Sequence, residues 1–338
     1  MIDLRSDTIT KPTPEMLEAM MSARVGDDVL GDDPTVNKLQ EKIASLFGME
    51  AALFCPSGTM TNQIAMRIHT RPQDEVICHK YSHVYMYEGG GMMYNSMLSP
   101  KLLEGDRGRI TADQIQESIN PDDIHYPKSK LVVLENTMNK GGGAIYDLEE
   151  VKRIRKVCDE NDLGLHLDGA RLFNAICETG EKPSDFGPLF DTISICFSKG
   201  LGAPVGSVLL GTKEKINEAK RVRKVFGGGM RQAGYLAAAC IYALDHHVTR
   251  LKEDHQRART IGEVMSKLSF IDEVMPVDTN IVIVKLADGK SEKWLLEEQK
   301  KQGILAVGFG KGLVRFVTHM DFSDDDLQEF SVAIRKIS

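Results

Sequence analysis

Two short apolar runs in the middle of the chain, between Gly164 and Gly206, each end in a charged residue. Residues 165–167 lead to Asp168, and residues 193–197 lead to Ser198 and Lys199. Apolar runs of this length, bounded by glycine and polar turns, predict buried strands of a largely parallel sheet. The functional groups of open α/β sheets lie at the carboxyl ends of the strands. We therefore expect Asp168 and Lys199 at that edge.

The same patterns extend along most of the chain. They predict an alternation of strands and helices, with right-handed crossovers, that is typical of a doubly wound or related α/β domain. The expected strands cover residues 51–55, 75–78, 130–135 and 207–210, and the expected helices cover residues 13–23, 35–47, 147–161, 213–224, 233–244 and 246–268, with one more beginning near 61.

The pattern changes near residue 272. Strands at 279–286, 304–307 and 313–318 alternate with helices at 291–302 and 323–337, which predicts a small α+β unit. We therefore expect a large domain over residues 1–250, including the N-terminal segment, and a small C-terminal domain over residues 251–338.

Composition narrows the class of protein. The chain has 338 residues, and its net charge of −7 includes no basic block, which argues against a dedicated nucleic-acid binder. It begins with charged residues where a secretory signal has an apolar run, and no stretch approaches the roughly 20 apolar residues of a membrane span. The six cysteines are scattered singly, without metal-ligand spacing. These features predict a cytoplasmic protein with reduced thiols, no structural metal and no membrane partner.

A carboxylate and a lysine at one sheet edge suggest pyridoxal 5′-phosphate (PLP). Its aldehyde needs a lysine amine, and its ring nitrogen needs an anionic partner to stay protonated. The alternative is an ordinary surface ion pair between Asp168 and Lys199. Gly200 and Gly202 favour the cofactor, because little bulk follows the lysine.

Three further features carry candidate chemistry. The turn Ser57-Gly58-Thr59 precedes a helix and suits a phosphate, although most such turns are only helix caps. The ring-rich segment 79–87 offers side chains that could stack on a planar cofactor, or it is an ordinary aromatic loop. Arg315 stands among apolar residues of a strand, where burial demands a partner: a substrate carboxylate or a structural acid.

The chain as a whole resembles the L-threonine aldolases, the low-specificity and L-allo-threonine enzymes that use PLP on the aspartate-aminotransferase-like fold (fold type I). The resemblance rests on many motifs in one order: LRSDTITKPT, VGDDVLGDDPT, ALFCPSGTMTNQ, DIHYP, LENT, HLDGARLFNA, FSKGLGAPVGS, GGGMRQAG, LKEDH and VRFVTH.

The resemblance implies a role for each matching residue. Lys199 would bind PLP covalently, and Asp168 would pair with its ring nitrogen. His83 would lie over the ring and, with His125, face the substrate hydroxyl. The remaining implied roles are phosphate binding by Gly58, Thr59 and the Arg231 of a neighbouring subunit, and carboxylate binding by Ser6, Arg171 and Arg315. A homo-oligomer, either a dimer or a homotetramer, with sites shared between subunits follows from the role of Arg231.

Two positions depart from the family pattern. Leu30 stands where a tyrosine is common, and Met138 stands where a histidine is usual. We expect these changes to affect substrate preference and rate rather than the type of reaction.

The expected activity is retro-aldol cleavage of L-threonine, L-allo-threonine and other L-β-hydroxy-α-amino acids to glycine and an aldehyde such as acetaldehyde. A histidine suits removal of the β-hydroxyl proton near neutral pH, and His83 or His125 is the candidate base. The alternatives are β-elimination or transamination on the same scaffold, and a non-catalytic PLP carrier.

Overall fold

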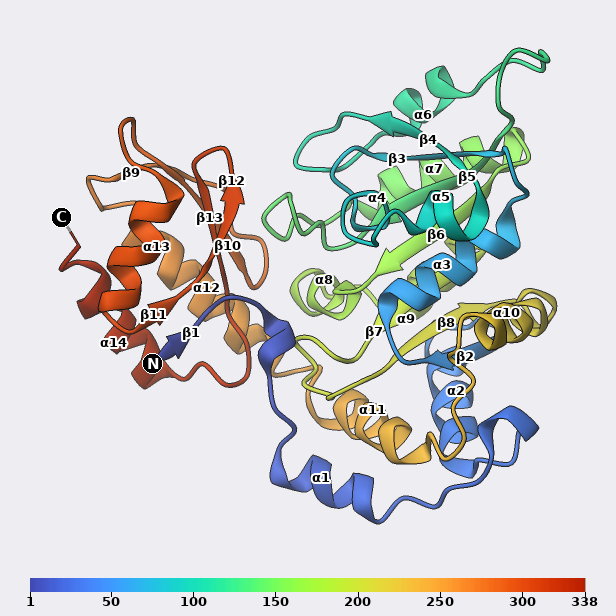
Figure 1. Ribbon diagram of the computed structural model, residues 1–338, viewed down its shortest axis with the longest axis horizontal. Coiled ribbons are helices and arrows are strands. Elements are labelled where there is room, and N and C mark those ends of the chain that lie inside the picture. Colours follow the sequence, from blue (N-terminus) through green and yellow to red (C-terminus); the bar gives the residue numbers. More distant parts are fainter. Residues whose placement is uncertain (338) are drawn as a thin grey trace.

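A seven-stranded sheet forms the centre of the larger of two lobes (Figure 1). The computed structural model describes residues 1–337. Six strands of this sheet run parallel, and β8 alone runs antiparallel to both of its neighbours. In spatial order the strands are β2 (Ala51–Cys55), β8 (Ser207–Gly211), β7 (Thr192–Cys196), β6 (Gly164–Gly169), β5 (Ser129–Glu135), β3 (Glu75–His79) and β4 (Ser99–Leu103).

The apolar runs form strands because both faces of the sheet are covered. Every residue of β3, β7 and β8 is buried. In the register of the central strands, Glu135 pairs with Asp168 and Asp168 pairs with Ser194. The carboxyl ends of β5 and β6, which carry Glu135 and Asp168, are therefore adjacent at one edge of the sheet.

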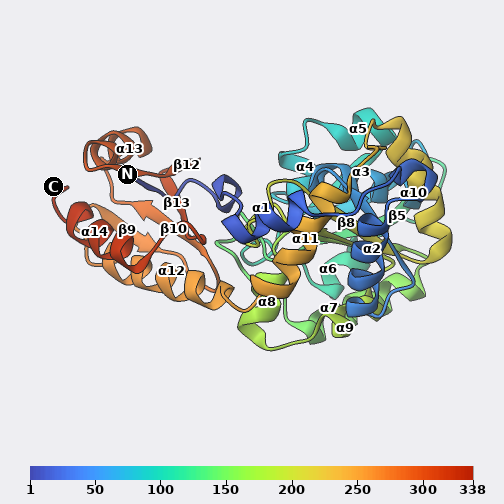
Figure 2. The same cartoon turned by 90° about the horizontal axis from the view of Figure 1, so that it is seen from below.

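Helices of the large lobe cover both faces of its central sheet. They are α1 (Pro14–Met21), α2 (Pro34–Phe47), α3 (Gly58–His69), α4 (His83–Met86), α5 (Gly91–Ser96), α6 (Ala112–Ser118), α7 (Leu148–Glu160), α8 (Leu172–Thr179), α9 (Pro183–Phe186), α10 (Lys213–Val225) and α11 (Gly234–His246). Short 3-10 helices occupy Asp7–Ile9, Asp28–Leu30 and Gly187–Leu189. Seen from below, α1 and α11 lie against each other and α2 lies beside α11 (Figure 2).

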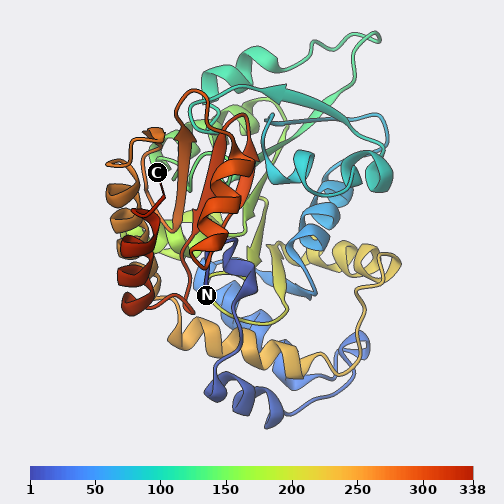
Figure 3. The same cartoon turned by 60° about the vertical axis from the view of Figure 1, so that its left-hand side comes forward.

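The smaller lobe has its own sheet and core. An antiparallel sheet in the order β12 (Val307–Gly310), β13 (Leu313–Val317), β10 (Ile281–Leu286) and β9 (Ile271–Val274) packs with α12 (Leu251–Met265), α13 (Glu292–Lys301) and α14 (Asp324–Ile334) (Figure 3). The first strand, β1 (Ile2–Asp3), pairs in parallel with β11 (Ile304–Leu305). Because Ile2 and Leu4 also enter this core, the N-terminal residues lie with the C-terminal lobe. The domain boundary near residue 250 stays a prediction.

The predicted fold class is confirmed: a mainly parallel sheet between helices, followed by a small α+β unit. Sequence patterns did not indicate β4, whose burial alternates between half-buried and exposed positions, nor the short helices α4, α5, α6, α8 and α9. The helix expected near residue 61 begins at Gly58, where the Ser57 hydroxyl accepts a hydrogen bond from the Met60 N–H and caps it.

Candidate active site

A cavity of 460 Å³ lies where the N-terminal segment, the carboxyl edge of the central sheet and the small lobe meet. It brings together five residues that the sequence singled out. Those five are Ser6, His83, Arg171, Lys199 and Arg315, and they line the cavity with Thr8, Tyr87, Asn139, Lys140, Val307, Gly308 and Phe309.

Asp168 lies near the end of β6, close to the ring of His83, and is 2% exposed. Its Oδ2 accepts a hydrogen bond from Asn62 Nδ2 at 2.9 Å, and its Oδ1 accepts one from the Ala170 N–H at 3.2 Å. No lysine or arginine of residues 1–337 pairs with it. The alternative of a surface ion pair between Asp168 and Lys199 is therefore excluded, and the buried carboxylate is left for a cationic partner.

His83 is held by two carboxylates at the start of α4. Its Nδ1 lies 3.0 Å from Glu88 Oε1, and its backbone N–H donates to Glu135 Oε2 at 2.7 Å. Burial lowers the pKa of the His83 ring, but the hydrogen bond to Glu88 and the charge of Asp168 outweigh it and raise the pKa above its ordinary value. Burial and the nearby Asp168 raise the pKa of Glu135 to about 7.

Arg171 forms a buried ion pair with Asp7. Its Nε and Nη2 donate to the two carboxylate oxygens of Asp7 at 2.8 and 2.7 Å, and Asn280 adds a third bond to Asp7 at 3.2 Å. Burial alone would raise the pKa of Asp7, but the guanidinium of Arg171 holds it well below its usual range. This pair joins the N-terminal segment to the start of α8.

Arg315 differs from Arg171 because it is buried without an acid. Its Nη1 donates to the Asn139 side chain at 2.7 Å and its Nη2 donates to the Arg5 carbonyl at 2.9 Å, while its Nε has no partner. Burial and the neighbouring Arg171 charge lower the pKa of Arg315 to about 10. A buried cation with only neutral partners, open to a cavity, suits an anionic ligand.

The predicted phosphate turn lies at the N-terminus of α3. A Cβ on Gly58 would lie 2.5 Å from Cys196 Sγ, so only glycine lets the turn pack this closely against the end of β7. Thr59 is exposed on the same turn. Free N–H groups at the start of a helix attract a phosphate. Cys196, which this turn packs against, precedes Lys199 by three residues.

Two of the predicted residues that do not line the cavity, His125 and Arg231, are exposed. His125 is exposed on the loop before β5, where its Nδ1 lies 2.6 Å from Asp123 Oδ1. Arg231 is exposed and pairs with Asp27 at 3.0 Å. Their roles stay predictions; that of Arg231 was expected to concern a neighbouring subunit.

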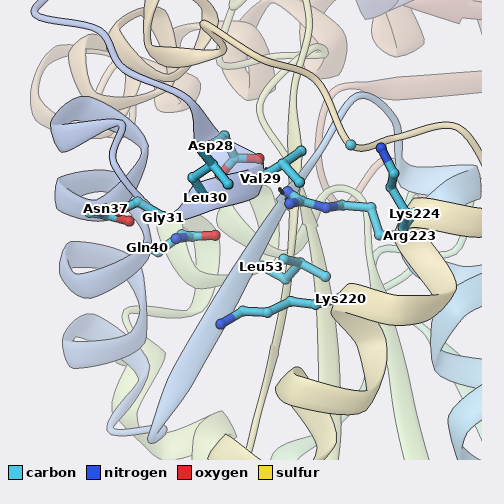
Figure 4. Close-up of a pocket in the computed structure, with 11 residues that line it drawn as sticks. Asp28, Val29, Leu30, Gly31, Asn37, Gln40, Leu53, Lys220, Arg223 and Lys224 are labelled. Carbon is cyan, nitrogen blue, oxygen red and sulfur yellow. Dashed lines mark hydrogen bonds and ion pairs between the residues drawn. The ribbon is translucent and has the colours of Figure 1, made fainter.

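The two departures from the family pattern also lie away from the cavity of their own chain. Leu30 is 72% exposed and borders a separate depression with Asp28 and Arg223 (Figure 4). Met138 is fully buried and fills the space beside Gly108 and Gly141. Met138 is therefore an interior packing residue and does not line the cavity.

Sequence patterns missed the residues that orient the predicted ones. Asn62, Glu88, Glu135, Asp7 and Asn139 hold Asp168, His83, Arg171 and Arg315 through the contacts described above. Only Glu135 carried a usable signal, since it ends a predicted strand like Asp168. The others lie in a helix or loops, where nothing in the spacing marks a polar residue as buried.

The residues fit PLP. Asp168 is a buried carboxylate without a lysine or arginine partner, Lys199 lines the cavity, and the tightly packed start of α3 contacts Cys196, three residues before Lys199. Lys199 would hold the aldehyde carbon, Asp168 the ring nitrogen and the turn at Gly58 the phosphate. A fold-type I, PLP-dependent enzyme is the class that this fold and site define.

Comparison with known proteins identifies the group within that class. Residues 3–289 match the family model described as beta-eliminating lyase. The low specificity L-threonine aldolase of Escherichia coli K12 is 43% identical over 97% of both chains. Among solved structures, a threonine aldolase of Leishmania major has a TM-score of 0.87 and 20% sequence identity, and the match covers 100% of this chain and 99% of that chain. A structure described as SPT with PLP has a TM-score of 0.75 and 16% sequence identity, and the match covers 99% of this chain and 88% of that chain. The chain belongs to the beta-eliminating lyase family and is a lyase.

Proposed function

We propose that this protein cleaves the Cα–Cβ bond of L-threonine, L-allo-threonine and related L-β-hydroxy-α-amino acids to give glycine and an aldehyde such as acetaldehyde. The observation that carries the proposal is Arg315, a buried guanidinium without an acid, in the same cavity as Lys199. Similarity to low specificity L-threonine aldolases supports the choice of substrate.

The carboxylate of the substrate would bind at Arg315. Its planar guanidinium can exchange the bond to Asn139 for a charge-assisted bond to the carboxylate. Arg171 lies close enough to lower the pKa of Arg315, but Asp7 already neutralises it, so Arg315 is the cation that favours an anion. Ser6 lines the same wall, and its hydroxyl already receives a bond from Thr8 Oγ1 at 2.8 Å. Fixing the carboxylate orients Cα–Cβ for cleavage.

His83 is the base that we favour for the β-hydroxyl proton. In the neutral ring, Nδ1–H donates to Glu88 Oε1, so Nε2 carries no proton and can accept one from the substrate. Glu88 stabilises the imidazolium that results. When bound, PLP supplies the electron sink for the pair left at Cα. His125 stays the second candidate for this proton, in case its loop approaches the cavity in the assembled enzyme.

Replacing Lys199 tests the proposal. We expect Lys199→Ala to lose both the absorbance band of covalently bound PLP and the cleavage of L-threonine. Lys140→Met is a matched control, because Lys140 lines the same cavity but donates to the Phe309 carbonyl at 2.8 Å; this variant should keep the absorbance band. Normal turnover by Lys199→Ala would refute the assignment.

We also propose a cytoplasmic homo-oligomer, either a dimer or a tetramer, with sites shared between subunits. Apolar side chains are exposed on α4, α5 and the residues that follow each helix, beside His83, and this area supports an interface. Its members are Tyr85, Met86, Tyr87, Met93, Tyr94 and Met97, which are 38–83% exposed. No helix within residues 1–337 is long and apolar enough to cross a membrane.

Mixing two inactive variants tests the shared site. If Arg231 serves the phosphate of a neighbour, Lys199→Ala and Arg231→Ala subunits together form hybrids that contain one intact site. We expect unfolding and reassembly of the mixture to restore part of the activity that each variant lacks alone. Absence of any recovery in hybrids that sedimentation shows to be assembled would count against the shared site.

A further inference from the structure

A row of polar side chains crosses the interior of the large lobe between α3 and the central sheet. His166 and Asp168 lie two residues apart on β6 and therefore point to the same face. Asn62 and His69 lie seven residues apart on α3 and therefore share one side of that helix. Thr192 pairs with His166 across β6 and β7. All five side chains meet between the helix and the sheet.

These side chains are linked without a gap. Asn62 Nδ2 lies 2.9 Å from Asp168 Oδ2, and Asn62 Oδ1 lies 3.1 Å from His166 Nε2. His166 Nδ1 lies 2.8 Å from Thr192 Oγ1, which lies 3.0 Å from His69 Nε2. The far nitrogen of His69 lies 3.4 Å from Lys215 Nζ.

The row ends at a second cavity, on the opposite edge of the sheet from the active site. This cavity has a volume of 340 Å³, and Lys130, Arg155, Asp191 and Lys215 help to line it together with His69. Arg155 is paired with Asp191 at 2.9 Å and Lys130 with Asp162 at 2.7 Å. Lys215 is the lysine of this cavity that faces His69.

The orientation of Asn62 determines where every proton in the row lies. Its amide nitrogen donates to Asp168 and also to Glu88 Oε1, at 2.8 Å. The reverse orientation would set its oxygen against two carboxylates. With the oxygen facing His166, the Nε2 of that ring must carry a proton, because an acceptor needs a donor.

The remaining links follow one by one. His166 Nδ1 lies 2.8 Å from the Thr192 hydroxyl and 3.1 Å from the Thr192 carbonyl. A neutral His166 protonated at Nε2 accepts at Nδ1, so the hydroxyl, which alone of the two can donate, donates to it. The same hydroxyl then accepts from His69 Nε2–H, and His69 Nδ1 accepts from Lys215. Every donor points from Lys215 toward Asp168. Burial lowers the pKa of His166 to about 4, and burial with the Lys215 charge lowers that of His69 to about 3, which agrees with two neutral rings.

We propose that Asn62, His166, Thr192 and His69 form a polarised hydrogen-bond chain that positions Asp168 against PLP and connects it to Lys215 at the far cavity. Asn62, His166 and Thr192 are 0–1% exposed. Burying so many polar groups gains little stability over an apolar core of the same shape. The chain instead supplies donors that hold Asp168 and Glu88 side by side as carboxylates. These residues are positioning residues, since they act on the cofactor through Asp168.

Other charged groups surround the two ends. Glu88, Glu135 and His83 lie near Asp168, whereas Asp191 and Arg155 lie near His69. Their charges affect the strength of the bonds in the hydrogen-bond chain but do not determine the direction in which its donors point, because that direction follows from the donors of Asn62. The inference rests on PLP binding at this site and is independent of the substrate proposed above.

The direct test is nitrogen-15 NMR of histidine-labelled protein, first free of PLP and then loaded. His166→Gln and His69→Gln identify the two signals. We expect both rings to be neutral and protonated at Nε2 near pH 7, in both states. A His166 ring that is protonated at Nδ1 or doubly protonated would contradict the proposed hydrogen-bond chain, whatever reaction the enzyme catalyses.

Thr192→Val tests whether the chain reaches the cofactor. It removes the hydroxyl and keeps the shape of the side chain, and we expect PLP binding about tenfold weaker, with Thr192→Ser restoring it. The matched control is Thr279→Val, which removes another fully buried hydroxyl, bonded to the Gly143 carbonyl at 3.2 Å. Equal PLP affinities for Thr192→Val and Thr279→Val would refute the coupling. If Thr192→Val does not fold, Lys215→Met is compared with Lys130→Met by the His69 NMR signal. A change in that signal in Lys215→Met alone supports the hydrogen-bond chain. An unchanged signal in Lys215→Met contradicts it.

Discussion

Arg315 and Arg171 show how neighbouring arginines acquire different tasks from their partners. Asp7 neutralises Arg171 through two hydrogen bonds, whereas Arg315 donates only to an amide oxygen and a backbone carbonyl. The free energy of the site therefore improves when an anion reaches Arg315. Arg171, neutralised in this way, mainly joins the N-terminal segment to α8.

Replacing Arg315 should damage substrate binding without removing the cofactor. We expect Arg315→Met to lower kcat/KM for L-threonine by about 100-fold, since a charge-assisted bond contributes roughly 1.5–3 kcal/mol. Arg315→Lys should recover part of the loss, because it restores the charge but not the planar fork. Steady-state kinetics and PLP titration measure both effects. A kcat/KM within twofold of wild type for Arg315→Met would contradict the carboxylate site.

The pH dependence of the reaction should reveal the pair of His83 and Glu88. The hydrogen bond that the His83 ring donates to Glu88 favours the protonated ring and contributes to the raised pKa of His83. Activity that needs the neutral ring is lost as pH falls through this pKa. Replacing Glu88 with Gln lowers that pKa, so the acidic limb of kcat/KM should move to lower pH. Glu104→Gln, at an exposed pair with Lys80, should leave the limb unchanged. A limb that stays or moves upward in Glu88→Gln would exclude His83 as the base.

At the level of elements, the site depends on how closely α3 approaches the end of β7. Gly58 begins the helix against Cys196, and the same helix presents Asn62 to Asp168. One helix therefore positions the phosphate turn at its start and the partner of the ring nitrogen one turn later.

A methyl group at Gly58 should separate these elements. We expect Gly58→Ala to weaken PLP binding and to destabilise the fold by about 1–3 kcal/mol, as overpacking does. The clash is with Cys196 Sγ at 2.5 Å, so the double variant Gly58→Ala with Cys196→Ala should recover most of the affinity. Fluorescence titration compares PLP binding by the wild type, the two single variants and the double variant. No recovery in the double variant would show that the loss has another cause.

Over the whole molecule, buried titratable groups oppose one another in their effect on stability. The pKa of His166 is lowered from 6.5 to about 4, so the unfolded chain binds more protons between these values and stability is lost as pH falls through them. The pKa of Glu135 is raised from 4.5 to about 7, so its contribution is present below 4.5 and is lost as pH rises through 7.

Single variants should separate the two contributions. Between about pH 4.5 and 6.5, the free energy of unfolding of Glu135→Gln should rise with pH more steeply than that of wild type, and that of His166→Gln should rise less steeply. Urea unfolding of the PLP-free protein at several pH values measures the slopes. The reverse order of the slopes would contradict these pKa directions.

Sequence patterns predicted most of the fold because the strands are buried on both faces and read as continuous apolar runs. They also placed Asp168 and Lys199, since both follow such runs. They could not place β1 beside β11, because that pairing joins residues about 300 positions apart. They could not identify Asn62 or Glu88 either, because the burial of a polar residue within α3 or the loop before α5 depends on what packs against it. The exposed position of His125 was equally inaccessible, because a motif carries no information about loop geometry.

The products formed from L-threonine test the central claim most directly. The purified enzyme, loaded with PLP, is incubated with L-threonine, L-allo-threonine and L-serine in parallel, and all products are quantified. We expect glycine and acetaldehyde in equal amounts from one or both threonine isomers. An α-keto acid and ammonia, without glycine, would contradict the account and assign the site to elimination.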